Sequence, residues 1–131
     1  MNFDLKGKVA FVTGATGGLG RHFAHVLSRA GTAVAVCGRR PEGLKGVEDE
    51  IQRAGGSVLA FAMDVTDQTQ IGWAFDKIEK SLGPVDILVN NAGMSVNGPV
   101  ADITADGFDS VIATNLRAPF LLSQEAGRRM I

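Results

Sequence analysis

Tyrosine is absent from this chain of 131 residues, and cysteine and tryptophan each occur once. Without tyrosine, the chain has no phenolic hydroxyl to serve as a general acid. Because Cys37 stands alone, no internal disulfide can form, which indicates a reducing compartment and predicts a cytoplasmic protein. We interpret Cys37 as a small apolar residue at a strand end, since no histidine or helix N-terminus is expected beside it.

An excess of one charge sign and long apolar runs are also lacking. The 13 basic and 14 acidic residues nearly cancel, so no basic stripe indicates nucleic acid as a partner. The apolar runs are too short to cross a membrane, and the N-terminus lacks a signal-peptide pattern. His22 and His25 are one helical turn apart, but no third ligand is near, so we expect surface residues and no metal.

A glycine-rich segment, 13–20, follows the apolar run 9–12 and precedes residues with a helical period. A strand, a glycine turn and a helix in this order place a pyrophosphate at a helix N-terminus. An ordinary strand-to-helix turn is the alternative. Glycines are expected at the tight turn, at the phosphate approach and where the helix packs on the sheet. The predicted phosphate-binding residues are Gly14, Thr16, Gly17, Gly18, Leu19 and Gly20.

Strands and helices are predicted to alternate along one dinucleotide-binding domain, residues 1–131. The alternation indicates right-handed crossovers and a parallel sheet of order 3-2-1-4, in a Rossmann-type doubly wound α/β fold. Such a fold continues through two further strands, so the second half is expected to be missing from this chain. The predicted strands are 8–13, 32–37, 58–63 and 85–89, and the predicted helices are 18–30, 41–54, 66–82 and about 104 to the C-terminus.

Polar and small residues follow the third and fourth predicted strands. Asp64 lies at the carboxyl edge of the sheet, where ligands bind, and its carboxylate can accept a hydrogen bond from an adenine amino group. A helix cap is the alternative role. Asn91 carries an amide that can bridge strands, whereas Ala92 and Gly93 are small enough to let the backbone approach a ribose.

The end of the second strand favours NADP over NAD. An acidic residue about twenty residues after the glycine turn would favour NAD. Gly38 takes that place here, and Arg39 and Arg40 follow it. Because a guanidinium is a good partner for a 2′-phosphate, we predict NADP(H) as the cofactor. A solvated Arg40 is the alternative.

Asn115 is expected inside the last helix, with Phe108, Val111 and Ile112 facing inward. Asparagine is unfavourable in a helix interior, so its presence there indicates a special role. Pro119 lacks the N–H that would bond the Asn115 carbonyl, which predicts a free carbonyl and a bend. A helix that simply breaks near Pro119 is the alternative.

Four motifs together resemble the short-chain dehydrogenase/reductase family: Thr13-Gly14-x-x-x-Gly18-x-Gly20, Asp64-Val65, Asn90-Asn91-Ala92-Gly93, and Asn115. The resemblance implies hydride transfer between a nicotinamide and a carbonyl or alcohol substrate, in a 3-oxoacyl reductase-like or similar enzyme. It implies adenine contacts by Asp64 and Val65, a catalytic Asn115 that holds a water through its carbonyl, and a homo-oligomer in the complete enzyme. Gly17 departs from many NADP-type relatives, which place a basic residue there.

The family's serine, tyrosine and lysine have no counterpart in this chain. In the family they follow the fourth strand, so we expect the chain alone to be inactive and to represent the N-terminal portion of an enzyme. An open edge at the fourth strand would favour association with another chain. The alternative function is a non-catalytic nucleotide-binding or interaction module that ends at Ile131.

Overall fold

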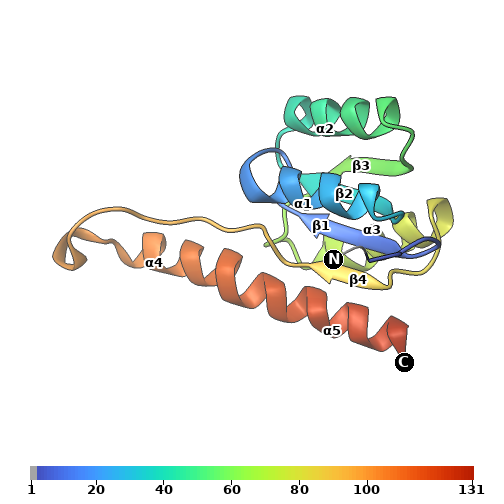
Figure 1. The fold of residues 1–131 in the computed structure, drawn as a ribbon. Coiled ribbons are helices and arrows are strands. Elements are labelled where there is room, and N and C mark those ends of the chain that lie inside the picture. The colour runs from blue at the N-terminus through green and yellow to red at the C-terminus, as the bar shows by residue number, and fades with distance from the viewer. Residues whose placement is uncertain (1–2) are drawn as a thin grey trace.

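A four-stranded parallel sheet forms the centre of the computed structural model, which describes residues 3–131 (Figure 1). The strand order is β3-β2-β1-β4, and all three neighbouring pairs are parallel. This confirms the predicted fold class and strand order. The strands are β1 (Val9–Thr13), β2 (Ala33–Gly38), β3 (Val58–Ala62) and β4 (Ile87–Val89).

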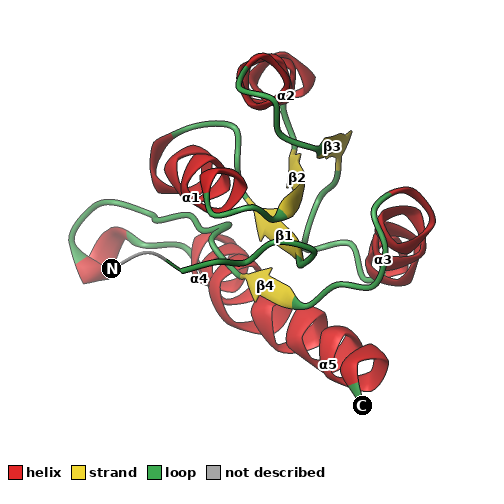
Figure 2. Ribbon diagram, turned by 45° about the vertical axis from the view of Figure 1, so that its right-hand side comes forward, coloured by secondary structure: helices red, strands yellow, loops and turns green. Residues whose placement is uncertain are grey.

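Helices cover both faces of the sheet (Figure 2). One face packs against α1 (Gly18–Arg29) and α2 (Pro41–Arg53), and the other against α3 (Thr69–Ser81) and α5 (Ala118–Met130). Successive side chains of a strand point to opposite faces. Neighbouring β1 residues Phe11 and Val12 therefore join different hydrophobic clusters, one on each side of the sheet. Burial on both faces explains why β1 is apolar along its length.

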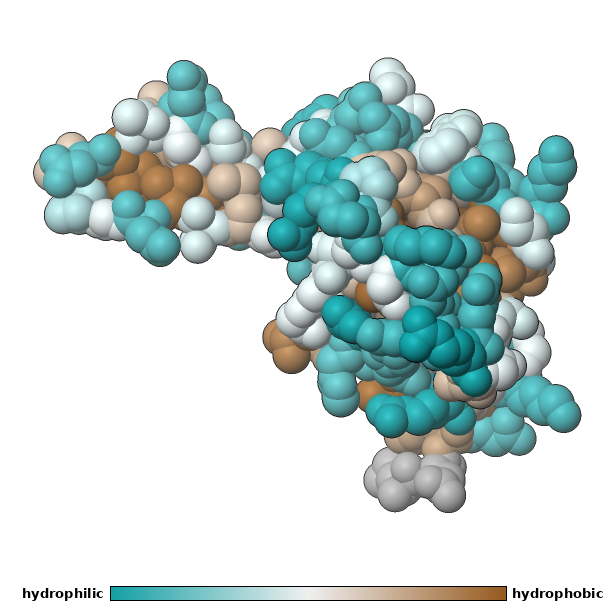
Figure 3. Space-filling view, turned by 90° about the horizontal axis from the view of Figure 1, so that it is seen from above, coloured by the Kyte–Doolittle hydropathy of each residue, from teal (hydrophilic) through white to brown (hydrophobic). Residues whose placement is uncertain are grey.

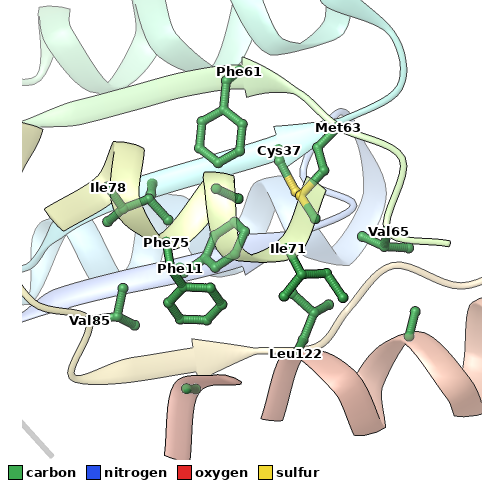
Figure 4. Close-up of a cluster of buried hydrophobic side chains, with 14 of the residues drawn as sticks. Phe11, Cys37, Phe61, Met63, Val65, Ile71, Phe75, Ile78, Val85 and Leu122 are labelled. Atoms are coloured by element: carbon green, nitrogen blue, oxygen red, sulfur yellow. The ribbon is translucent and has the colours of Figure 1, made fainter. Parts of the chain in front are cut away.

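Aromatic rings fill the cluster beneath α3 and α5 (Figure 4). The Phe11 ring centroid lies 5.6 Å from that of Phe75, edge to face, and 5.8 Å from that of Phe61. Cys37 belongs to the same cluster, and burial raises the pKa of its thiol to about 12. The thiol therefore remains protonated at neutral pH, which confirms its interpretation as a small apolar residue.

Helix α3 begins at Thr69, three residues later than the predicted start at position 66. Two aspartate side chains form local turns in the intervening segment. Asp64 Oδ1 accepts hydrogen bonds from the backbone N–H and hydroxyl of Thr66, and Asp67 Oδ1 accepts the same pair from Thr69. Such side-chain-to-backbone bonds compete with helical bonding, which delays the helix.

A nearly continuous helical rod follows a short 3₁₀ turn, η1 (Val100–Asp102), and forms the C-terminal part (Figure 1). It consists of α4 (Ala105–Ile112), the π-helical segment η2 (Ala113–Arg117) and α5. The Ala118 N–H donates to the Ala113 carbonyl, five residues earlier. This wide turn carries the helix past Pro119, so the alternative of a helix broken at Pro119 is wrong.

The predicted inward face of α4 is wrong, because none of its residues is buried. Phe108 is 59% exposed and Ile112 is 38% exposed. The rod and the loop before it extend past the sheet (Figure 1), and a hydrophobic patch lies on this projection (Figure 3). Within residues 3–131, no helix has both the length and the apolar character needed to cross a bilayer.

Candidate cofactor site

A cavity of about 710 Å³ lies at the carboxyl edge of the sheet. Segments that leave all four strands contribute to its wall, together with one face of α4 and η2. This edge is where open α/β sheets bind their ligands. The lining residues are Gly14, Thr16, Gly38, Arg39, Arg40, Met63, Asp64, Val65, Thr66, Asn91, Ala92, Gly93, Met94, Ser110, Ala113 and Thr114.

Most of the residues singled out from the sequence lie in this wall, although five do not. Those outside it are Gly17, Gly18, Leu19, Gly20 and Asn115. Sequence reasoning missed the contribution of the C-terminal rod. Ser110, Ala113 and Thr114 are spaced by three and four residues, which places them on one helix face. That spacing was a usable signal, but the apolar residues of the same segment obscured it.

The glycine turn after β1 has a backbone that only glycine adopts readily. Gly14 has φ +64° and Gly18 has φ +56°. A Cβ on Gly14 would lie 2.7 Å from the Cα of Ala92, so glycine allows the turn to approach the loop after β4. A Cβ on Gly20 would collide with the Gly14 carbonyl and the Asn91 amide. Both close approaches lie at the base of the cavity.

The N-terminus of α1 fits an anionic group. Its N-cap residue, Gly17, offers no side-chain hydrogen bond, and the first turn contains no acidic residue. The first N–H groups of a helix lack intrahelical acceptors, and the helix dipole adds positive potential there. Arg39 and Arg40 add two cations to the cavity wall. These donors and charges fit a phosphate-bearing dinucleotide.

Thr13 ties the end of β1 to the end of β4, and sequence reasoning did not assign it to the site. Its hydroxyl oxygen accepts hydrogen bonds from the N–H groups of Asn91 and Ala92, both at 3.1 Å. Asn91 Nδ2 in turn donates to the carbonyls of Thr13 and Gly14, at 3.1 and 3.0 Å. The predicted bridging role of the Asn91 amide is therefore present, and it fixes two loops of the cavity together.

Replacing Thr13 by valine is expected to reduce the free energy of unfolding by about 1–3 kcal/mol. The side chain is 1% exposed, so the substitution leaves two backbone donors without their acceptor. Urea denaturation followed by circular dichroism measures this loss.

Thr32→Val is the matched control for Thr13→Val. Thr32 is 2% exposed, and its hydroxyl has no hydrogen-bond partner among residues 3–131. Its replacement should leave stability unchanged or raise it, because the folded state loses no hydrogen bond. Equal losses for the two variants would contradict the structural role of Thr13.

Asp64 lies in the cavity wall and closes the turn before α3. Its Oδ1 accepts from the Thr66 N–H at 2.9 Å and from the Thr66 hydroxyl at 2.7 Å. Because α3 begins at Thr69, Asp64 is not its N-cap residue. Among residues 3–131, Asp64 Oδ2 makes no hydrogen bond, so this oxygen can still accept one from a ligand.

Asn115 holds the loop after β4 against the helical rod. Its Oδ1 accepts from the Met94 N–H at 2.9 Å, and its Nδ2 donates to the Met94 carbonyl at 2.8 Å. A second tie joins Asn90 Nδ2 to the Ser123 hydroxyl at 3.0 Å. The asparagine inside the helix thus pairs its amide with a backbone that would otherwise lack partners. This contact accounts for its unfavourable position.

His25 joins α1 to α2. Its Nε2 lies 2.7 Å from Glu50 Oε2, and Arg21 also binds Glu50. Burial lowers the pKa of His25, and the neighbouring Arg21, Arg29 and His22 add to the effect. Within the part of the chain that the structure describes, no cluster of three or more histidine, cysteine, aspartate or glutamate residues could hold a metal.

The family model described as short chain dehydrogenase matches residues 8–131. The short chain dehydrogenase/reductase dpmpG of Macrophomina phaseolina is 42% identical over 130 residues, which cover 98% of this chain and 74% of that protein. Gluconate 5-dehydrogenase of Gluconobacter oxydans is 36% identical over 129 residues, which cover 98% of this chain and 50% of that protein. The chain spans about half the length of most curated relatives that it matches.

Solved structures match the fold over nearly the whole chain. A short-chain type dehydrogenase/reductase from Mycobacterium marinum has a TM-score of 0.94 and 38% identity, with 98% of this chain and 51% of that chain covered. A metagenomic short-chain oxidoreductase in complex with NADP has a TM-score of 0.91 and 37% identity, with 97% and 58% covered. The similarity includes every strand and helix described above.

Proposed function

Because this chain belongs to the short chain dehydrogenase family, we propose that it is the nucleotide-binding portion of an NADP(H)-dependent oxidoreductase. The observation that carries the proposal is the cavity at the carboxyl edge of the sheet, which combines an uncapped helix N-terminus with two arginines. A bound nicotinamide would supply or accept the hydride, and the substrate would be a small carbonyl or alcohol compound. Two relatives are named for gluconate and D-threitol.

We assign the predicted site residues to parts of the dinucleotide. The turn after β1 would hold the phosphates through Gly14, Thr16, Gly17, Gly18, Leu19 and Gly20. Arg39 and Arg40 would bind the 2′-phosphate, whereas Asp64 and Val65 would contact adenine. Asn91, Ala92 and Gly93 would support a ribose. Asn115 would act through its carbonyl, by holding a water that relays protons.

The complete protein is proposed to be a cytoplasmic homo-oligomer, whose missing half supplies serine, tyrosine and lysine. In residues 3–131, β4 pairs only with β1, so its other edge is open to a further strand. The most direct test is the coding sequence downstream of Ile131. An in-frame Tyr-x-x-x-Lys would support the oxidoreductase, whereas a stop codon there would favour the non-catalytic nucleotide-binding module.

Replacing Arg39 by alanine is expected to weaken NADPH binding about ten-fold or more and to leave NADH binding nearly unchanged. A charged hydrogen-bonded contact contributes about 1.5–3 kcal/mol, and only NADPH carries the 2′-phosphate that would receive it. Calorimetric titration of the chain with each cofactor measures the difference.

Arg53→Ala is the control for Arg39→Ala, because Arg53 is an exposed arginine that is absent from the cavity wall. It should change neither affinity. An equal loss for both cofactors on replacing Arg39, or tighter NADH binding by the unmodified chain, would contradict the cofactor assignment.

A further inference from the structure

The side chain of Thr16 lies between two glycines that belong to different elements. An ideal Cβ on Gly38, at the end of β2, would lie 2.5 Å from Thr16 Cγ2. An ideal Cβ on Gly43, within α2, would lie 2.8 Å from Thr16 Cβ. Both distances are shorter than real Cβ contacts, so neither position can carry a side chain while Thr16 keeps its place.

The hydroxyl of Thr16 is directed at Arg40. Arg40 Nη2 donates a hydrogen bond to Thr16 Oγ1 at 3.2 Å. Threonine has few χ1 rotamers, and here the methyl group lies between the two glycines. The methyl contacts therefore fix the direction in which the hydroxyl points. Thr16 and Arg40 both line the cavity, as does Gly38.

We propose that Thr16 is the residue that sets the preference for the 2′-phosphate, by positioning Arg40 and by keeping position 38 free of an acidic side chain. An arginine held in place loses less conformational entropy when it binds an anion. The same methyl group occupies the space that the Cβ of an aspartate at position 38 would need. This inference rests on the proposed function and adds to it the packing of Thr16, Gly38 and Gly43.

The positioning role can be tested with adenosine 2′,5′-bisphosphate and adenosine 5′-monophosphate, which differ only in the 2′-phosphate. The chain carrying Thr16→Val keeps the shape of the side chain and loses the acceptor for Arg40. We expect it to bind the bisphosphate about three- to ten-fold more weakly and the monophosphate unchanged. Thr16→Ser retains the hydroxyl and should stay within about two-fold of the unmodified chain for both probes.

The exclusion role can be tested by introducing the acid. Gly38→Asp alone should weaken both NADPH and NADH, because Thr16 is displaced. With Thr16→Ala added, the nearest Thr16 atom to the new Cβ is its own Cβ, at 3.7 Å, which is an ordinary contact. The double variant should therefore prefer NADH, which gives a non-additive pair. Circular dichroism of each variant confirms that the fold is retained.

The outcomes separate the inference from the proposed function. If the unmodified chain binds the two adenosine probes equally, both the NADP(H) assignment and the role of Thr16 are overturned. If it prefers the bisphosphate and Thr16→Val keeps that preference, only the role of Thr16 is overturned. A Gly38→Asp variant that prefers NADH without any change at Thr16 would also overturn the exclusion role.

Discussion

The 131-residue chain is expected to reduce no carbonyl compound at a measurable enzymatic rate when NADPH is supplied. Hydride transfer to a carbonyl builds negative charge on oxygen, which must be protonated or stabilised as it forms. The chain contains no tyrosine, and the Cys37 thiol is buried away from the cavity. The Asn115 amide is paired with the backbone of Met94 and is not an acid.

The acidic residues near the strand ends are also engaged elsewhere. Asp64 accepts two hydrogen bonds from Thr66, and Asp86 Oδ2 accepts from the Val9 N–H at 2.9 Å. General acid catalysis contributes about 10²–10⁴-fold, and the loss of substrate positioning adds to that deficit. The rate should therefore be indistinguishable from the reaction without protein.

The assay follows NADPH oxidation with a panel of ketones, using purified chain whose mass matches residues 1–131. A complete short-chain reductase serves as the positive control for the same panel. Turnover that remains with the chain through purification would show that the acid is supplied within residues 1–131 or by a copy of the chain, and would overturn the prediction.

The second large effect is expected for Gly18→Val, which should abolish measurable NADPH binding. Gly18 has φ +56°, and no atom lies within 4 Å of the position its Cβ would take. A branched side chain would enter this open space at the N-terminus of α1, where we place the pyrophosphate. The positive φ adds a destabilisation of about 1–3 kcal/mol.

Gly55→Val separates these two consequences. Gly55 has φ +85°, its Cβ would also meet open space, and it follows α2 outside the cavity wall. Both variants should lose similar stability in urea denaturation, but Gly55→Val should bind NADPH like the unmodified chain. Normal affinity of Gly18→Val would show that the turn does not hold phosphate.

The sheet could be predicted from the sequence because its strands are buried on both faces. Continuous apolar runs such as 9–12 and 34–37 mark such strands, and the glycines between elements mark their ends. The start of α3 could not be predicted in the same way. Apolar periodicity does not report that Asp64 and Asp67 hold the preceding backbone in turns.

The site was predictable where residues follow strands and less so where distant elements meet. The residues after β3 and β4 lie in the cavity wall because parallel strands end at one edge. The buried hydrogen bonds of Thr13 depend on the spacing between β1 and β4, which is a tertiary property. The exposure of Phe108 likewise depends on which element covers α4, and periodicity within α4 carries no such information.

The π-helical segment η2 keeps one face of the C-terminal rod aligned over an unusual length. In a regular α-helix, residues four apart rotate by about 40° around the axis at each step. Five such positions from the cavity to the core would then be spread over about 160°. The wider turn of η2 removes part of this rotation. The five positions are Ser110, Thr114, Ala118, Leu122 and Ala126.

A single rotational phase therefore serves two purposes along this rod. Ser110 and Thr114 line the cavity, while Leu122 and Ala126 complete the hydrophobic core. Because helices are stiff, a change in how Leu122 seats in the core would rotate or shift the wall of the cavity at the other end. Core packing beneath α5 thus sets the shape of the cavity without any contact between the two.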